Sequence, residues 1–545
     1  MKNIRYSFAF LAIIVIATAS AMARTVEIKI SQCPKPYVEN LRKTVAKLSN
    51  NDEFVLDFDK PGKYEFDGSI KFRCNTTIKG LGPNATKVIV REGFNSGKSK
   101  MNDDTFLAFH GSSSKKVKVE IKNVSLELAQ HNGILWEKAD KLQVKVWYGD
   151  GVLVDNVVFK SRDAVLTNLD LRECDNVIVQ NSEFENYNNC EAGGCLWSRG
   201  SQKNIIVRNN VFRKYGHDEV LAFWGGRSNS NEITQMKNIT IEGNDFYFGN
   251  KIKSKNIFSK AVFICIYHFK EDIFKVHNKC DVDNIVFKDN SITIDDVVAR
   301  DIAFFFDSLA EVGKIKLINN KITNTTKTST TSNYLNDITL QASGNVKYPI
   351  VINDNTVENH GEILGYGNNS GYTFVSLKDV DVSMEGNVVE SDYGVGFLWC
   401  HAGSMNITLL NNKASNLYKT GILGSSEGDS KVMITASGNT FSGDTRITCK
   451  NVKDLQLNYK NNTLNSTGYH FFLQEGAEQT SINFENNIVN SLTGKGIIFA
   501  NYSGKQCDFS NVNISNNTFN GLKKADIVEP LNKARNIQIN NNIYR

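Results

Sequence analysis

Residues 205–212 read IIVRNNVF, residues 239–246 read ITIEGNDF and residues 482–489 read INFENNIV. In each stretch, apolar residues alternate with polar ones up to an Asn, and another apolar residue follows shortly after. Residues 513–519, NISNNTF, repeat the pattern near the end of the chain. A pattern that recurs along a whole chain is the signature of a solenoid, in which each repeat packs mainly against its two neighbours.

The repeats can be aligned on one Asn each, which gives about 15 coils. The anchors are Asn123, Asn156, Asn181, Asn210, Asn244, Asn290, Asn320, Asn355, Asn387, Asn412, Asn439, Asn462, Asn487, Asn517 and Asn542. Coils stacked about 4.8 Å apart would form a rod about 70 Å long. A solenoid grows by adding coils, so one elongated body is expected despite the length of 545 residues.

The alternation has a period of two, and its apolar positions are rich in Ile, Val and Phe. This period predicts β-strands rather than helices, so each repeat should be a coil of short strands. Asn suits a sharp turn because its side chain tolerates the left-handed backbone region and bonds locally. Stacked in register, such asparagines also form amide ladders. The sequence therefore predicts an all-β solenoid.

The first residues predict export. Lys2 and Arg5 precede an apolar run over residues 8–16, and Ala-Met-Ala at residues 21–23 has the form of a cleavage site. Residues 1–23 are thus predicted to be a signal peptide, and the exported protein, secreted or periplasmic, would begin at Arg24. No later segment has 18 uninterrupted apolar residues, so no membrane span is expected.

Residues 24–100 form an N-terminal region before the regular repeats, which occupy residues 101–545. Apolar residues at helical spacing predict a short amphipathic helix over residues 37–48. Strands are expected over residues 54–58, 64–66 and 88–90. A helix in front of the first coil would cover its open edge and its apolar interior.

This combination of features resembles the pectate-lyase-like right-handed parallel β-helix superfamily. The resemblance rests on the capping helix, on DKPGKYEF at residues 59–66, on IKGLG at residues 78–82 and on the Asn-marked coils. It covers nearly all of the mature chain and implies a right-handed parallel β-helix. The superfamily includes polysaccharide lyases, glycoside hydrolases, epimerases, phage tailspikes and adhesins, so the resemblance leaves the activity open.

Reactive and sugar-stacking side chains are densest between residues 163 and 227. Three coils contribute to this cluster, with strands expected to align as residues 164–168, 194–198 and 220–224. The residues proposed here for catalysis are Asp163, Glu191, Arg199, Tyr215, His217 and Asp218, and those proposed for substrate binding are Trp197, Trp224, Arg227, Lys253 and Lys255.

The roles follow from what β-elimination on a uronic acid requires. Arg199 and Arg227 can pair with the sugar carboxylate through two parallel hydrogen bonds. His217 titrates in the right range for a base or an acid, and Tyr215 can protonate the leaving oxygen. Trp197 and Trp224 can stack on sugar faces.

A glycoside hydrolase is the alternative on the same fold. Side chains one or two coils apart are separated by about 4.8 or 9.6 Å. These distances bracket the carboxylate separations of about 5 Å for retaining enzymes and about 6.5–9.5 Å for inverting enzymes. A non-catalytic glycan-binding or surface-interaction protein is a further alternative, because aromatic and basic side chains alone suffice for binding.

Charge favours an anionic polymer as the partner. Residues 251–279 contain seven Lys, including Lys253 and Lys255, whereas the whole chain carries a net charge of +5. A basic loop above a groove attracts an anionic polysaccharide. No nucleic-acid partner is expected. The metal requirement is open, with calcium as a possible cofactor.

The ten Cys are mostly expected to be buried thiols, because many of them occupy strand-like positions. Cys190 with Cys195 is the best disulfide prediction, and Cys33 with Cys74 is the second. The sequence contains no Cys or His spacing typical of a zinc site.

Overall fold

The computed structural model of the 545-residue chain describes residues 23–90, 105–128, 142–161, 167–188, 194–216, 219–225, 233–249, 259–266, 279–295, 299–306, 310–325, 336–342, 345–360, 370–376, 379–392, 396–402, 404–417, 420–424, 430–443, 447–450, 452–466, 477–491, 509–528 and 535–545. The predicted signal peptide lies outside these ranges except for Ala23.

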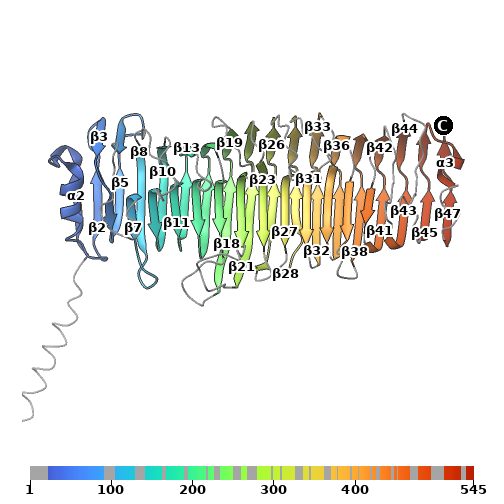
Figure 1. Cartoon of the computed structure of the whole chain (residues 1–545), viewed down its shortest axis with the longest axis horizontal. Coiled ribbons are helices and arrows are strands. Elements are labelled where there is room, and N and C mark those ends of the chain that lie inside the picture. The colour runs from blue at the N-terminus through green and yellow to red at the C-terminus, as the bar shows by residue number, and fades with distance from the viewer. Residues whose placement is uncertain are drawn as a thin grey trace, which may run out of the picture.

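The strands wind into a rod whose long axis runs across the coils (Figure 1). They form a large sheet A and a second sheet B, and every pairing between named strands is parallel. The right-handed parallel β-helix predicted from the sequence is confirmed.

Sheet B has one strand in each coil that contributes to it. Its strands are β4 (Ile70–Phe72), β7 (Thr105–His110), β9 (Leu142–Trp147), β11 (Thr167–Arg172), β14 (Gly194–Arg199), β17 (Glu219–Trp224), β20 (Ser259–Ile266), β23 (Ala299–Phe306), β27 (Asn336–Ala342), β31 (Ser370–Ser376), β34 (Gly396–Ala402), β37 (Thr420–Gly424) and β40 (Ile447–Lys450).

Sheet A bends at the Asn turn, so most coils contribute one strand on each side of it. Before the turn lie β1 (Thr25–Lys29), β2 (Glu53–Asp57), β5 (Asn75–Lys79), β12 (Asp175–Gln180), β15 (Gln202–Arg208), β18 (Thr234–Glu242), β21 (Cys280–Lys288), β24 (Ala310–Val312), β25 (Ile315–Ile318), β28 (Asn345–Val346), β29 (Ile350–Asn353), β32 (Val380–Glu385), β35 (Ser404–Leu410), β38 (Lys431–Ser437), β41 (Val452–Lys460), β43 (Ala477–Glu485), β45 (Phe509–Ser515) and β47 (Asn536–Asn540).

Beyond the turn lie β3 (Gly62–Phe66), β6 (Thr86–Val90), β13 (Glu183–Asn188), β16 (Val211–Gly216), β19 (Asp245–Gly249), β22 (Ser291–Asp295), β26 (Lys321–Asn324), β30 (Thr356–Asn359), β33 (Val388–Ser391), β36 (Lys413–Leu417), β39 (Thr440–Gly443), β42 (Thr463–Ser466), β44 (Ile488–Ser491), β46 (Thr518–Asn520) and β48 (Ile543–Tyr544). The long strands β8 (Val117–Leu128) and β10 (Gly149–Ser161) span both parts.

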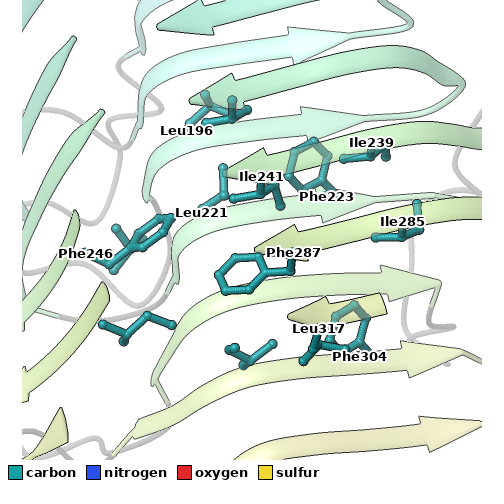
Figure 2. Packing of buried hydrophobic residues seen from close by; sticks show 14 of the residues in the cluster. Leu196, Leu221, Phe223, Ile239, Ile241, Phe246, Ile285, Phe287, Phe304 and Leu317 are labelled. Carbon is teal, nitrogen blue, oxygen red and sulfur yellow. The ribbon is translucent and has the colours of Figure 1, made fainter. Parts of the chain in front are cut away.

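The core is continuous because alternate side chains from both sheets point into the coil (Figure 2). Leu196 and Leu221 of sheet B and Ile239 of sheet A are all fully buried. Equivalent positions stack along the rod, as Phe184 and Phe212 show with ring centroids 4.8 Å apart. Each stacked aromatic pair adds about 0.5–1.5 kcal/mol beyond the burial of its area.

Asparagines form the predicted ladder inside the turn. Asn355 donates from its backbone N and from Nδ2 to Oδ1 of Asn387, at 3.0 and 3.1 Å, and Asn387 bonds Asn412 in the same way. The ladder is unbroken through Asn210, Asn244, Asn290, Asn320, Asn355, Asn387, Asn412, Asn439, Asn462, Asn487, Asn517 and Asn542.

The first three anchors occupy a different position. Asn123, Asn156 and Asn181 have φ of 57°, 54° and 52° and take the left-handed turn position, as Asn209 does in a later coil. Ser182, next to Asn181, takes the position in front of the ladder, and its backbone N donates a hydrogen bond to Oδ1 of Asn210 at 3.0 Å. The alignment was therefore shifted by one residue in these coils, because both turn positions favour Asn.

Helix α2 (Tyr37–Val45) covers the N-terminal end of the rod, as predicted. Val38, Leu41 and Val45 are buried in the core. The helix ends three residues before the predicted residue 48. The 3₁₀ helix η1 (Ile30–Gln32) precedes it.

The C-terminal end also has a helix, which the sequence did not predict. Helix α3 (Lys524–Val528) lies between β46 and β47 at the far end of the rod in Figure 1. Ile527 is fully buried and Leu522, just before the helix, is almost fully buried, and both belong to the core. An inserted segment therefore closes this end.

The predicted disulfides are absent. Cys33, Cys74 and Cys195 are free thiols, so neither the Cys33–Cys74 pair nor a pair involving Cys195 forms. Cys195 lies in β14, where its Sγ is 3.7 Å from the Arg213 carbonyl oxygen. Burial raises the pKa of this thiol to about 12, so it stays protonated. The prediction that most cysteines are buried thiols is confirmed for Cys74, Cys174, Cys195 and Cys280.

Candidate functional site

The outward face of sheet B near the N-terminal end carries two columns of side chains that depart from the repeat. The inner column is Lys71, Ala108, Lys145, Asp170, Trp197 and Ala222, which pair in register from β4 to β17. The outer column, at the carboxyl ends of the strands, is His110, Trp147, Arg172, Arg199 and Trp224, and Arg73 directly follows the end of β4. Successive coils bring these side chains about 4.8 Å apart.

Asp170 joins the two columns. Its Oδ2 accepts a hydrogen bond from Nε of Arg172 at 2.8 Å, and its Oδ1 accepts one from Nε of Arg199 at 3.0 Å. The carboxylate is fully buried, whereas the two arginine side chains are about a quarter exposed. A charge-assisted pair of this kind fixes both guanidinium groups side by side at the surface.

Lys145 lies one coil before Asp170 in the same column. The residue is fully buried and its Nζ lies 4.7 Å from the centre of the Trp147 ring. No residue in the described ranges accepts a hydrogen bond from this amine. Burial, aided by the nearby guanidinium of Arg172, lowers the pKa of Lys145 to about 8. A sizeable fraction of the amine is therefore neutral in mildly alkaline solution.

His110 is the first imidazole of the outer column and packs edge-on against Trp147, with ring centroids 5.7 Å apart. Burial lowers its pKa to about 4, and the cations Lys71 and Lys145 act in the same direction. The imidazole is thus neutral near pH 7. The field around this face is strongly positive, because five cationic side chains surround one carboxylate.

Two predicted substrate-binding residues belong to this face. Trp197 is 7% exposed, and its indole lies below the Arg199 guanidinium, 4.6 Å from Cζ. A side chain at Gly194 would come within 2.7 Å of its Nε1, so the close approach requires glycine there. Trp224, one coil further, is partly exposed. Trp224 is therefore the better placed of the two for contact with a ligand.

Of the predicted catalytic residues, the structure describes two, Arg199 and Tyr215. Arg199 ends β14 and lies level with Trp224, which ends β17. His217 and Asp218 lie outside the described residues, just before Glu219 begins β17. Asp163 and Glu191 also lie outside the described residues, shortly before β11 and β14 respectively.

The expected strand register was wrong. Thr167 pairs with Gly194, and Leu196 pairs with Leu221. The expected strand over residues 164–168 is therefore shifted by three residues relative to its neighbour, and the one over residues 220–224 by one. The shift places Asp170 and Arg172 on the outward face beside Trp197 and Arg199. Both lie between residues 163 and 227, where reactive side chains are densest, but the sequence pattern assigned neither of them a role.

Tyr215 lies on the part of sheet A that leads into the amino end of β17. It lies near the end of β16, where its ring stacks on Tyr187 at 4.5 Å and packs against Tyr247 at 5.7 Å. Tyr247 donates a hydrogen bond to Oδ2 of Asp295 at 3.0 Å. Burial and this carboxylate raise the pKa of Tyr247 to about 12. Tyr215 itself is nearly buried within this stack.

The remaining predicted binding residues lie outside the described residues. Arg227 follows the end of β17 by three positions, and Lys253 and Lys255 precede β20. Sequence reasoning also missed Lys145, Trp147 and His110. Their signal was a shared register with Arg172 and Arg199, which becomes visible only when the strands of sheet B are aligned.

Within the described ranges, no three His, Cys, Asp or Glu side chains lie close enough to hold a metal ion. Of the helices that the structure describes, none is long and apolar enough to cross a membrane.

Solved structures with similar folds include several carbohydrate-active enzymes. DFA-IIIase from Arthrobacter chlorophenolicus A6 is 10% identical, with 79% of this chain and 95% of that chain covered and a TM-score of 0.42. The family 28 exopolygalacturonase of Yersinia enterocolitica is 12% identical, with 80% and 79% covered and a TM-score of 0.45.

A fragment from the N-terminal part of bacteriophage Phi29 gene product 12 is 10% identical, with 98% and 95% covered and a TM-score of 0.36. No protein-family model and no curated protein matches this sequence. The parallel β-helix fold that the resemblance implied is confirmed by the strand pairing of this chain.

Proposed function

We propose that this chain is an exported carbohydrate-active enzyme that binds an acidic polysaccharide on the outward face of sheet B and cleaves it by β-elimination. The observation that carries the proposal is the grouping of Lys145, Arg172 and Arg199 around the single carboxylate of Asp170. Export rests on the predicted signal peptide. The carbohydrate-active enzymes among proteins of similar fold are compatible with this function.

Binding comes first. Arg172 and Arg199 are held about one coil apart by Asp170 and remain partly exposed, so they can engage the carboxylate of a uronic acid. Trp147 and Trp224 flank them in the same column and offer faces for sugar rings. Neutralising the sugar carboxylate makes the adjacent C5 proton more acidic, which is the requirement of the elimination.

The elimination needs a base. The base removes the C5 proton, the electron pair forms the C4–C5 double bond, and the C4–O bond breaks as a donor protonates the leaving oxygen. Lys145 suits the base because its pKa of about 8 leaves part of the amine neutral. Since the residue is fully buried, the side chains that cover its amine must move before the sugar can reach it. His217 is the alternative base and Tyr215 the alternative proton donor. Both follow from the sequence, and His217 lies outside the described residues.

Hydrolysis on this face is less well supported. A glycoside hydrolase uses two carboxylates, and the two outward columns contain one, Asp170, within the described strands of sheet B. Asp163 and Glu191 could supply the second from the preceding turns. A protein that binds glycans without cleaving them would use the same arginines and tryptophans.

The test is incubation of the purified mature protein with polygalacturonate, alginate and neutral glucans, with calcium or with a chelator. Ultraviolet absorbance of an unsaturated uronate product is expected with an acidic polymer. New reducing ends without that absorbance would replace the lyase with a hydrolase. Binding without either product would leave a non-catalytic glycan-binding protein.

A further inference from the structure

The C-terminal coils carry a second surface, on the part of sheet A beyond the Asn turn. Five neighbouring strands there contain no charged residue at all: β39 (TFSG), β42 (TLNS), β44 (IVNS), β46 (TFN) and β48 (IY). In the same part of sheet A, every strand from β13 to β36 contains at least one charged residue. Since 22% of the whole chain is charged, this uncharged face is a local departure from its composition.

The uncharged face is also regular. Its first column is Thr440, Thr463, Ile488, Thr518 and Ile543, and its second is Ser442, Asn465, Asn490 and Asn520. Buried residues lie between the two columns, so both point outward. Ile488 and Ile543 are 45% and 48% exposed, among the most exposed large apolar side chains in the described residues.

The amides of the second column form a ladder that leaves capacity for a ligand. Asn520 donates from Nδ2 to Oδ1 of Asn490, and Asn490 donates to Oδ1 of Asn465, each at 2.7 Å. Asn465 donates to Oγ of Ser442 at 3.2 Å. A side-chain amide has two N–H donors and two acceptor lone pairs. For Asn490, the ladder uses one donor and one lone pair, so a second donor and acceptor remain at this partly exposed position.

This chemistry identifies the ligand class. We propose that the uncharged face binds a neutral, hydroxyl-rich polysaccharide in insoluble form. Sugar hydroxyls both donate and accept, as the ladder amides and the threonine hydroxyls do. The exposed Ile and Thr methyl groups can pack against the C–H faces of the sugar rings. An anionic polymer would lose hydration without gaining a cationic partner, so it is disfavoured here.

The regular repetition of the face over five strands favours an extended polymer over a short oligosaccharide. The face lies on consecutive parallel strands about 4.8 Å apart, so equivalent side chains recur at this spacing along the rod. The proposal does not depend on the function proposed for sheet B. It predicts a second site on the same rod, with the opposite electrostatic character.

The test is depletion of the full mature protein from solution by washed particles of cellulose, of insoluble β-1,3-glucan and of chitin. Retention by at least one of them is expected, and it should persist in about 1 M NaCl, because no ion pair contributes. The variant Thr463→Lys/Ile488→Lys should be retained at least tenfold less. Its matched control is Thr356→Lys/Val388→Lys, in the same column on β30 and β33, which should bind like the wild type.

Three results would overturn the proposal: no retention on any particle, retention that molar salt abolishes, or equal losses in the two variants. Circular dichroism of both variants establishes that they fold. A second copy of the protein is the other possible partner of this face, and sedimentation of the wild type tests for it. Lateral association of rods in the wild type that is abolished in Thr463→Lys/Ile488→Lys would assign the face to self-assembly. Turnover of acidic polysaccharide should be unchanged in both variants, so failure here is distinct from failure of the sheet B site.

Discussion

The asparagine ladder of sheet A and the basic face of sheet B run along the same rod but are built on opposite principles. In the ladder, each coil repeats the same residue and the same hydrogen bonds from Asn210 to Asn542. On the face of sheet B, five successive coils place His, Trp, Arg, Arg and Trp at one position of the outer column. The residues that repeat from coil to coil build the scaffold, and the positions where the coils differ form the surface that can recognise a ligand.

The largest effect is expected from breaking the ladder at its centre. In Asn355→Leu, Asn320 loses the acceptor of its backbone N and its Nδ2, and the carbonyl of Leu317 loses a donor. Several buried polar groups are then unsatisfied, each costing about 1–3 kcal/mol. We expect a loss of 3 kcal/mol or more in unfolding free energy, on the order of the sum of these costs, measured by urea denaturation.

The control for the ladder is Thr356→Ala on the adjacent, outward position of β30, which should change stability little. Because a solenoid can unfold locally, limited proteolysis should cleave the Asn355→Leu variant near the middle of the chain, around the substituted coil. Equal stability of the two variants would show that the ladder contributes no more than an exposed position does.

The next largest effect is expected on the face of sheet B. Arg172→Gln/Arg199→Gln should lower kcat/KM on the acidic polysaccharide at least 100-fold, about 2.7 kcal/mol, because both partners of the sugar carboxylate are removed. The Arg213→Gln variant carries the same change on sheet A, where Arg213 pairs with Glu183, and should retain activity. Similar activities in the two variants would place the substrate elsewhere.

Lys145 should make the stability of the protein depend on pH. Its pKa is about 8 in the folded protein and about 10.4 in an unfolded chain, so between these values the unfolded state binds more protons. Stability contributed by this group therefore rises as pH increases from about 8 to about 10.4. Lys145→Met should flatten that rise relative to the wild type in urea denaturation across this range.

The same variant tests the base. If Lys145 removes the C5 proton, the elimination rate of the wild type rises with an apparent pKa near 8, and Lys145→Met loses activity by at least about 100-fold. A rate that rises with an apparent pKa near 6.5 would instead assign the base to a histidine such as His217.

The fold was readable from the sequence because its signals are local and repeated. The turn asparagines and the period of two fixed the strands of sheet A, and the helical spacing of Val38, Leu41 and Val45 predicted α2. Even the one-residue error at Asn123 has a local cause, since the left-handed and the ladder positions are adjacent and both accept Asn. Helix α3 was not predicted because its five residues are too few to show the apolar periodicity of an amphipathic helix.

The candidate site was less readable because no marker residue sets the register of sheet B. The segments between each Asn turn and the next sheet B strand differ in length, so counting from Asn156 misplaced Asp170 by three positions. Arg199 and Trp224 were identified from residue type alone. Their neighbours Lys145 and Trp147 were missed because they belong to a coil whose contribution only the strand pairing reveals.

The smallest effect is expected in the tyrosine stack at the amino ends of the strands. Tyr247→Phe removes the hydrogen bond to Asp295, which still accepts one from Oγ1 of Thr325, so a cost of at most about 1 kcal/mol is expected in urea denaturation. Turnover should be unchanged because the ring contact with Tyr215 is kept. Tyr215→Phe is the variant to compare with it. If Tyr215→Phe reduces turnover and Tyr247→Phe does not, the proton donor lies in this stack. If neither variant reduces turnover, catalysis is confined to the arginine face of sheet B.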